Sequence, residues 1–156
     1  KEFNASIIAP NTIRTIEGGL LSYQSDFGRE HNTYTIGLDR LVDVDQDVDF
    51  IGKEALKKIK EEGISEKLVG VEIDGDPIQK APENFWPVFD VNSNKIGRLS
   101  RCFYSPRLKK NIGLAIIDMK FTESGTSLVI ESPKAHLNAQ VHELPWFPAE
   151  KSTNLD

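Results

Sequence analysis

The sequence is nearly devoid of cysteine and has no long apolar run. Its single cysteine, Cys102, cannot build an internal disulfide framework and fits a reducing compartment, so we expect a cytoplasmic protein. No apolar run approaches the roughly 20 residues that span a bilayer, and residues 1–4 lack the charged-then-apolar layout of a signal peptide. We expect no membrane partner. The first residue is Lys1 rather than methionine, which indicates a part of a longer chain.

An excess of positive charge is also missing, because the formal net charge is -5 at pH 7. Binding to a phosphate backbone needs a field of the opposite sign, so we expect no nucleic-acid partner. With 38% hydrophobic and 28% charged residues, the chain has the composition of one or two globular units with a buried core.

Familiar catalytic and metal motifs are absent as well. The sequence has no Gly-x-Ser-x-Gly elbow, no phosphate loop and no dinucleotide fingerprint. His31, His136 and His142 lie too far apart in the sequence to argue for zinc. Cys102 lies beside Arg101 but has no histidine near it in sequence, and we interpret it as a packed strand residue.

An acidic run at residues 43–49 resembles the start of a calcium loop, with Glu54 at the twelfth position. The sixth position, however, is Val48, where such a loop needs glycine for its sharp turn. We therefore expect a solvated connection whose acids favour the N-terminus of the next helix, and no metal site.

In the first part of the chain, the apolar spacing predicts a helix between Ala9 and Tyr23, capped by Asn11. Its apolar face comprises Ile13, Ile16, Leu20 and Tyr23. Gly18 and Gly19 weaken a helix, and we interpret them as a site of close packing.

A polar loop at residues 22–33 precedes a predicted strand from Tyr34 to Val44. The most strongly patterned helix follows at residues 50–63, with Gly63 as its stop and one apolar face formed by Ala55, Leu56 and Ile59.

After Ser65 the sequence changes to short β-type runs separated by turn residues. Six strands are predicted, at residues 67–73, 87–91, 95–100, 111–118, 127–131 and 136–142. Six closely spaced strands without intervening helices indicate a small antiparallel barrel or sandwich. We therefore expect a boundary near residue 65 and a frayed polar tail at 149–156.

The stretch from Ile96 to Ile117 is the most distinctive part of the sequence. It combines two strand-like runs, a break at Ser105-Pro106, and no carboxylate between Asp90 and Asp118. Two interpretations remain open for its cations: they bind an anionic ligand or acidic partner, or they form a solvated loop. The cations are Arg98, Arg101, Arg107, Lys109 and Lys110.

Four blocks together resemble the C-terminal part of the glycine-cleavage T-protein (aminomethyltransferase) family. In order, they are residues 16–26 (IEGGLLSYQSD), 49–56 (DFIGKEAL), the stretch just described with Tyr104-Ser105-Pro106, and 144–147 (LPWF). The resemblance extends from about Pro10 to Phe147. It is especially close to the dimethylsulfoniopropionate demethylase-like branch, on the evidence of Pro10-Asn11 and the run from Leu20 to Tyr23.

The resemblance implies an α+β chain in two parts. Residues 1–65 would be the helix-strand-helix remainder of a folate-binding domain, and residues 66–148 a small antiparallel β-barrel that caps it. The implied cofactor is tetrahydrofolate. The implied partners are the upstream folate-binding domain of the same protein and a small methyl or aminomethyl donor. The family's catalytic aspartate lies further toward the N-terminus, so we expect no catalytic residue in this chain and no activity from it alone.

By resemblance, five residues are candidates for the folate pocket: Asn11, Arg14, Glu17, Tyr23 and Asp26. Glu17, Tyr23 and Asp26 match family positions, and helix capping or core packing explains them equally well. The family has arginines at the positions of Asn11 and Thr15, a departure that favours a divergent methyltransferase over glycine cleavage itself. Arg14 is the nearest substitute, about 100° around the helix from Thr15.

Two functions therefore remain. The favoured hypothesis is the C-terminal portion of a tetrahydrofolate-dependent one-carbon transferase. The alternative is a non-catalytic binding or docking module whose basic cluster recognises an acidic surface or a polyglutamate tail.

Overall fold

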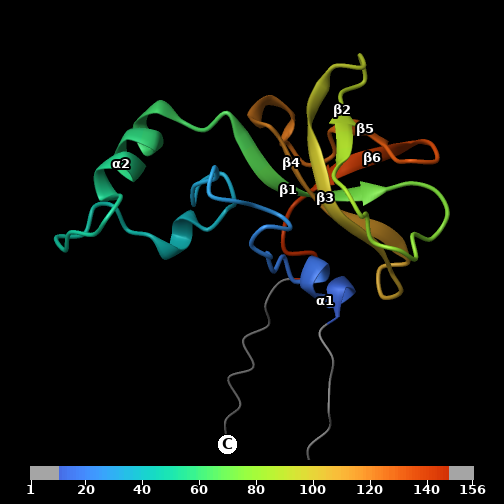
Figure 1. Cartoon of the computed structure of the whole chain (residues 1–156), viewed down its shortest axis with the longest axis horizontal. Coiled ribbons are helices and arrows are strands. Elements are labelled where there is room, and N and C mark those ends of the chain that lie inside the picture. The colour runs from blue at the N-terminus through green and yellow to red at the C-terminus, as the bar shows by residue number, and fades with distance from the viewer. Residues whose placement is uncertain (1–10, 148–156) are drawn as a thin grey trace, which may run out of the picture.

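The structure, a computed structural model, describes residues 11–147 and divides them into a helical part and a barrel (Figure 1). The helical part contains α1 (Thr12–Glu17), the 3-10 helix η1 (Asp39–Leu41) and α2 (Lys53–Glu62). The barrel contains β1 (Glu66–Ile73), β2 (Trp86–Phe89), β3 (Lys95–Ser105), β4 (Lys110–Asp118), the 3-10 helix η2 (Met119–Phe121), β5 (Ser127–Glu131) and β6 (His136–His142).

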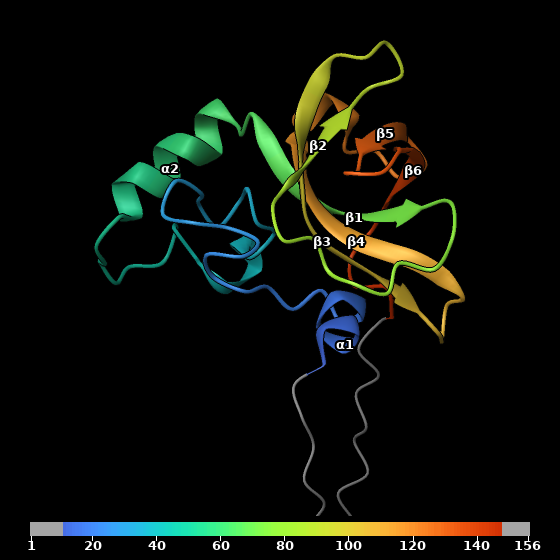
Figure 2. The same ribbon diagram turned by 45° about the vertical axis from the view of Figure 1, so that its right-hand side comes forward.

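The six strands close into a barrel in the order β1-β4-β3-β2-β5-β6, with every pairing antiparallel (Figure 2). This arrangement confirms the predicted fold class. The predicted break at Ser105-Pro106 is the turn between β3 and β4, and residues 90–94 join β2 to β3. Closure leaves none of these strands with an unpaired edge.

Strand β4 shows why the chain has two apolar cores. All seven residues from Asn111 to Ile117 are buried, because both faces of this strand are covered. Ala115 and Ile117 point into the barrel, whereas Ile112, Leu114 and Ile116 belong to a second cluster with Ile16 and Trp146 on the outer wall. A strand covered on both faces reads as a continuous apolar run rather than an alternating one.

Strand β3 is five residues longer than predicted, and a β-bulge explains the difference. Leu99 pairs with Ala115 and Arg101 pairs with Leu114, so Ser100 is an extra residue on this strand. A bulge shifts the alternation of inward and outward side chains. The period-two pattern therefore stops at residue 100, although the strand continues to Ser105.

Helix α1 is shorter than the predicted helix between Ala9 and Tyr23. Asn11 caps it as predicted, since its Oδ1 accepts a hydrogen bond from the Ile13 N–H at 2.9 Å, but Gly18 ends it. Gly19 has φ +64°, a left-handed conformation that ends helices and favours glycine. The predicted apolar face is wrong beyond this point, and Leu20 and Tyr23 are exposed. Ala9 and Pro10 lie outside the described residues, as does the tail at 149–156.

The predicted strand from Tyr34 to Val44 is wrong. Turns and η1 occupy this segment. Two local features favour turns over a strand here. Asn32 Oδ1 accepts hydrogen bonds from the N–H groups of Tyr34 and Thr35, and Gly37 adopts a left-handed conformation with φ +70°. Ile36 and Val44 are buried here without being extended, whereas Leu41 is exposed.

Helix α2 confirms the predicted helix, and Gly63 ends it with φ 82°. We call residues 11–37 the N-terminal segment and residues 38–62 the arm. Figures 1 and 2 both show the arm standing to one side of the barrel, with α2 and the loop before it on the side away from the strands. Of the predicted helix face, Ala55 is exposed and Leu56 and Ile59 are half-buried. None of the helices in residues 11–147 has the length and apolar character to cross a membrane.

Candidate functional site

A groove of about 400 Å³ lies where the N-terminal segment meets the barrel. One side is formed by Thr12, Gln24 and Ser25, and the other by residues 81–85, which lead into β2. Ser100 and Arg101 of β3 also line it. Phe85, 48% exposed, is the aromatic side chain in the groove, and the remaining lining is largely polar.

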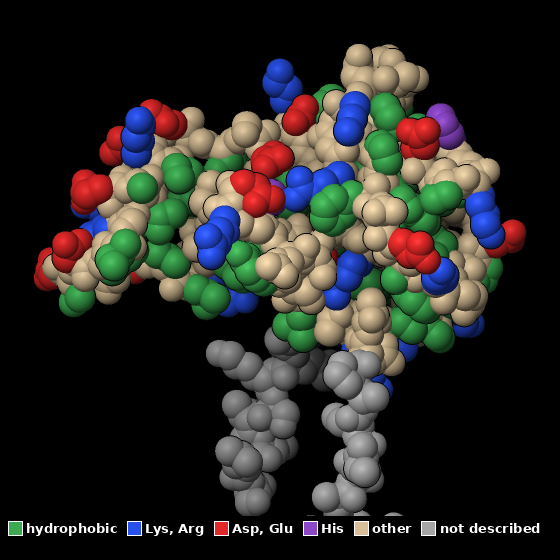
Figure 3. Space-filling view, in the orientation of Figure 1, with side chains coloured by type: hydrophobic (Ala, Val, Ile, Leu, Met, Phe, Trp, Pro, Cys, Tyr) green, Lys and Arg blue, Asp and Glu red, His purple; other side chains and the backbone are tan. Residues whose placement is uncertain are grey.

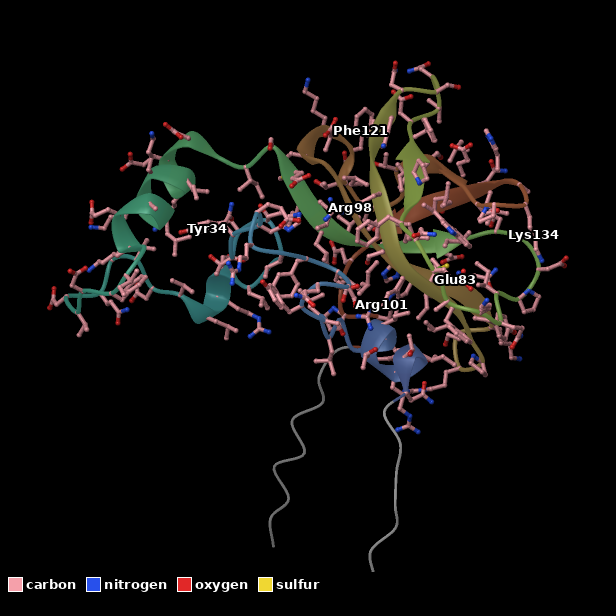
Figure 4. All side chains as sticks on the ribbon, viewed as in Figure 1. Tyr34, Glu83, Arg98, Arg101, Phe121 and Lys134 are labelled. Carbon is pink, nitrogen blue, oxygen red and sulfur yellow. The ribbon has the colours of Figure 1, made fainter. Side chains whose placement is uncertain are left out.

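The bulge in β3 fastens the N-terminal segment beneath this groove. Successive strand side chains normally point to opposite faces, but here Ser100 and Arg101 both reach Asp26. Ser100 Oγ donates to Asp26 Oδ1 at 2.8 Å, and the Arg101 guanidinium binds both carboxylate oxygens at 2.8 and 2.6 Å. Asp26 is completely buried. Figure 4 shows Arg101 where β3 passes α1.

Arg101 is committed to this attachment. It also donates to Thr15 Oγ1 at 3.1 Å and to the carbonyl of Leu20 at 2.9 Å. The Asp26 carboxylate accepts a further hydrogen bond from the Ser22 N–H at 2.7 Å. Both partners of this buried ion pair are thus extensively hydrogen-bonded, as a buried pair requires.

A second buried carboxylate, Glu17, fastens the end of α1. It accepts a hydrogen bond from Ser105 Oγ at 2.6 Å and lies 3.8 Å from the Arg107 guanidinium. The carbonyl of Glu17 accepts a hydrogen bond from the Trp146 N–H at 3.0 Å. Glu17 therefore joins α1 to the end of β3 and to the segment after β6.

The five predicted folate residues separate into two groups. Asn11, Glu17 and Asp26 have the structural contacts described above. Arg14 is exposed on α1, and Tyr23 is 52% exposed with its ring edge-on to Phe27, 5.7 Å between centroids. Tyr23 immediately precedes Gln24 and Ser25 of the groove, whereas Asp26 lies beneath it.

Sequence reasoning missed the groove residues Thr12, Gln24, Ser25 and Phe85. These are common polar and aromatic types without a diagnostic spacing, and the groove brings together positions about 60 to 75 residues apart. The left-handed conformation of Gln24, φ 68°, belongs to the turn that presents this side of the groove and has no sequence signature at glutamine.

The predicted basic cluster does not form one patch. Arg101 binds Asp26, Arg107 lies over the Phe147 ring at 3.9 Å, and Lys110 pairs with Glu72 at 2.7 Å. Arg98 lies over the Phe85 ring at 4.8 Å. These contacts point to different parts of the molecule, so these four cations act in attachment and packing. Lys109, the fifth cation, is exposed at the turn between β3 and β4.

Arg98 also belongs to a small charged group around His31. The His31 side chain is 1% exposed, and its Nδ1 accepts a hydrogen bond from the Gly28 N–H at 3.0 Å. Its Nε2 lies 3.4 Å from Arg98 and 3.6 Å from Glu66. Like Asp26, this histidine connects the N-terminal segment to the barrel wall.

Cys102 is fully buried in the barrel, and burial raises the pKa of its thiol to about 12. A thiol in this environment is a packing group rather than a nucleophile. In the acidic run, Asp45 pairs with Lys60 at 2.7 Å, and the hydrogen bond from Lys60 lowers the pKa of Asp45. Across residues 11–147, no three acidic, histidine or cysteine side chains are grouped to hold a metal ion.

These features define a class of protein: a six-stranded antiparallel barrel domain that carries a preceding helical segment fastened to its outer wall, with a groove between them. The glycine cleavage T-protein C-terminal barrel domain matches residues 66–148. The chain therefore belongs to the glycine cleavage T-protein family.

Curated relatives extend the similarity beyond the barrel. The aminomethyltransferase of Geobacillus sp. (strain WCH70) is 38% identical over 143 residues, and that of Bacillus cytotoxicus is 36% identical over 144 residues. Each match covers 92% of this chain but 38% of the relative, so the chain spans well under half the length of these proteins.

A solved structure is similar in fold. The glycine cleavage system aminomethyltransferase T from Bartonella henselae superposes with a TM-score of 0.75, over 85% of this chain and 36% of that protein. The identity between the two is 19%, so this comparison supports the fold and no finer inference.

Proposed function

We propose that this chain is the C-terminal portion of a tetrahydrofolate-dependent one-carbon transferase of the aminomethyltransferase type. The observation that carries the proposal is its identity of 38% and 36% to two aminomethyltransferases over 92% of its length. That similarity includes the N-terminal segment and the arm as well as the barrel. Within the proposed enzyme, the chain supplies one wall of the folate site and no catalytic residue.

The groove fits part of a folate. Its volume of about 400 Å³ lies in the range of small-molecule sites, and its single aromatic ring and surrounding hydroxyl and amide groups suit a flat ring system with polar edges. Thr12, Gln24, Ser25 and Phe85 would hold the ligand, with Tyr23 and Arg14 next to them on the N-terminal segment. Asn11, Glu17 and Asp26 would support the wall from behind.

Tetrahydrofolate supplies the amine nitrogen that accepts the one-carbon unit. Such a transfer depends on holding donor and acceptor in line in a site that excludes water. The rigid attachment of Gln24 and Ser25 through the neighbouring Asp26 serves this positioning. If this loop moved freely, the bound folate would not stay aligned with the donor. The contacts of Asp26 with Ser100 and Arg101 fix this side of the groove against β3.

For the donor, we propose a methyl sulfonium compound rather than an aminomethyl carrier. Two features of the sequence support this choice: asparagine and threonine stand at Asn11 and Thr15, where the family has arginines, and the run from Leu20 to Tyr23 resembles the dimethylsulfoniopropionate demethylase-like branch.

The test is a chimera in which this chain replaces the C-terminal 38% of the Geobacillus aminomethyltransferase. We expect the folded chimera to transfer a one-carbon unit to tetrahydrofolate, and Gln24→Ala with Phe85→Ala to raise KM for the folate more than they lower kcat. Val91→Ala, on the exposed β2–β3 turn, is the control. A folded chimera inactive toward both sulfonium and aminomethyl donors contradicts the proposal. So does measurable transfer by the isolated 156 residues.

A further inference from the structure

One side of the groove is formed by residues 79–85, which we call the strap. Within the part of the chain that the structure describes, the backbone of the strap makes no hydrogen bond. Ile78, just before it, is fixed, because its N–H donates to Asn111 Oδ1 at 2.8 Å and its carbonyl accepts from the Tyr104 N–H at 2.9 Å. The strap ends where β2 begins. It is therefore fastened at its two ends and depends on side chains between them.

Side chains supply what the backbone of the strap lacks. Lys80 and Glu83 form an ion pair within it, but both side chains are largely exposed, and exposed pairs contribute little. Phe85 contacts Arg98 of β3, whose guanidinium carbon lies over the ring at 4.8 Å from its centroid. A cation within about 6 Å of an aromatic ring centroid is attracted to the ring face. Phe85 is therefore the point at which the strap is attached to the barrel wall.

The register of β2 and β3 explains why these two side chains meet. Arg98 pairs with Pro87, and Phe85 lies two residues before Pro87. Alternate residues of an extended chain face the same side, so Phe85 and Arg98 share the outer face of the barrel. Their neighbours Trp86 and Leu99 pack in the interior cluster. The contact is therefore fixed by the pairing of the two strands.

Arg98 also reaches the other side of the groove. Its Nη2 lies 3.6 Å from Glu30 Oε1 and 3.4 Å from His31 Nε2, and both residues belong to the N-terminal segment. Figure 3 shows acidic, histidine and basic side chains together in this region, and Figure 4 shows Arg98 beside β3. One guanidinium group thus contacts both parts of the chain that form the sides of the groove.

The polar contacts of Arg98 are weaker than those of Arg101. Arg101 binds Asp26 at 2.6 and 2.8 Å, whereas the polar contacts of Arg98 are 3.4 Å or longer. The buried Nε of Arg98 has no hydrogen-bond partner within residues 11–147. A buried donor left unpaired is costly, so hydrogen bonding does not explain why Arg98 lies here. Its stacking on Phe85 does.

We propose that Arg98 is a positioning residue for the folate site, which holds Phe85 and the strap at a fixed distance from the N-terminal segment. The inference rests on the proposed function, in which Phe85 is the aromatic side chain of the groove. A flat ligand needs its stacking partner at a defined distance, and a ring that is fixed in advance loses less conformational entropy on binding. Arg98 lies outside the groove lining, so it acts through Phe85.

Steady-state kinetics of the chimera described above test this role. Arg98→Met removes the cation and keeps an unbranched stem, and it should raise KM for tetrahydrofolate about two- to fivefold with kcat nearly unchanged. Arg98→Lys should recover most of the loss, because it restores a cation near the ring. Lys110→Met is the control, since Lys110 pairs with Glu72 and does not line the groove. An unchanged KM in a folded Arg98→Met chimera overturns the proposal.

A second background separates positioning from direct contact with the ligand. In the Phe85→Leu chimera the ring is gone, so the addition of Arg98→Met should raise KM by less than about twofold. If Arg98 instead bound a carboxylate of the folate, the two changes would multiply, and the loss would grow with the number of glutamates in the folate tail. Multiplying effects overturn the proposal.

The isolated chain tests the contact without any folate. In a proton–nitrogen correlation spectrum, the Nε–H signal of Arg98 should lie upfield because of the Phe85 ring and should move downfield in Phe85→Leu. The Nε–H signal of Arg107, which lies over Phe147, is the matched control and should not move. Backbone order parameters of the strap should fall in Arg98→Met. Equal order parameters in wild type and variant overturn the proposal, whether or not the chimera is active.

The proposed function fails separately. A folded chimera that transfers nothing, together with a strap that loosens in the Arg98→Met isolated chain, contradicts the enzyme and leaves the attachment of Phe85 by Arg98. An active chimera whose KM does not respond to Arg98→Met overturns the positioning role alone.

Discussion

The N-terminal segment and the arm are neighbours in sequence, yet they use their side chains in opposite ways. The N-terminal segment buries two carboxylates, Asp26 and Glu17, and an isoleucine, Ile16, against the barrel. The arm leaves Leu41, Val48 and Ile51 exposed and makes no extensive contact with any strand. The first segment is therefore packed on the barrel as part of its outer core, whereas the second projects away from it. A boundary near residue 65 would separate Asp26 from Arg101, so we propose that residues 11–37 fold together with the barrel.

Two ion pairs of nearly the same length, one in each region, make this difference measurable. Arg101 and Asp26 are 2.6 Å apart and buried, and Lys60 and Asp45 are 2.7 Å apart and exposed. We expect Arg101→Ala to lower the free energy of unfolding by about 3 to 5 kcal/mol, because it leaves a buried charge without its partner. Asp45→Ala should produce no measurable change in urea unfolding, since exposed pairs contribute little. Similar losses in the two variants would contradict the comparison.

Two isoleucines, one in the N-terminal segment and one in the arm, test whether the two regions also differ in how much apolar packing contributes to stability. Ile16 is fully buried in the outer core, whereas Ile51 is fully exposed in the arm. Ile16→Ala should cost about 2 to 5 kcal/mol through lost burial and a residual cavity. Ile51→Ala should change the free energy of unfolding by less than about 0.5 kcal/mol. Urea unfolding followed by tryptophan fluorescence measures both, and a large loss from Ile51→Ala would mean that the isolated chain already covers the arm.

A smaller effect is the pH dependence of stability. Asp90, in the turn between β2 and β3, represents the barrel in this comparison. Hydrogen bonds from the side chain and backbone of Asn94, and from Asn92, lower the pKa of Asp90 below 3.8. Its contribution to stability is therefore complete above pH 3.8 and is lost as the pH falls through the folded-state pKa. The stability difference between wild type and Asp90→Asn, measured by urea unfolding, should be constant above pH 3.8 and shrink as the pH falls below it.

Asp45 has a lowered pKa as well, but it lies in the arm. We expect Asp45→Asn to leave the pH profile of global unfolding unchanged, because the arm can open without the barrel. A change as large as that of Asp90→Asn would show that arm and barrel unfold as one unit.

The sequence predicted the barrel well because its strands follow simple rules of burial. Turn residues separate the strands in the sequence. Where both faces of a strand are covered, as in β4, its inward-facing and its outward-facing residues are both apolar. The predictions fail where local chemistry overrides periodicity. Gly18 and Gly19 end α1 early, and Asn32 with Gly37 turns a segment whose apolar spacing indicated a strand.

The candidate site was harder to predict, because its attachments join distant residues. Asp26 and Arg101 are 75 positions apart, and no spacing rule connects them. Resemblance identified Glu17 and Asp26 as notable residues, and the structure gives each of them a structural contact. The groove itself arises from the meeting of two loops, and its lining residues have no pattern that a single sequence reveals.

The bulge at Ser100 has a consequence for how this fold tolerates change. Leu99 and Cys102 both belong to the interior cluster although they are three positions apart, whereas residues of a regular strand return to the same face every second position. Deleting one residue here would keep nearly every side chain and still exchange inside for outside along part of the strand. The attachment of the N-terminal segment therefore depends on the number of residues in β3 as much as on their types. We expect insertions and deletions near residue 100 to destabilise the protein more than substitutions at the surface do.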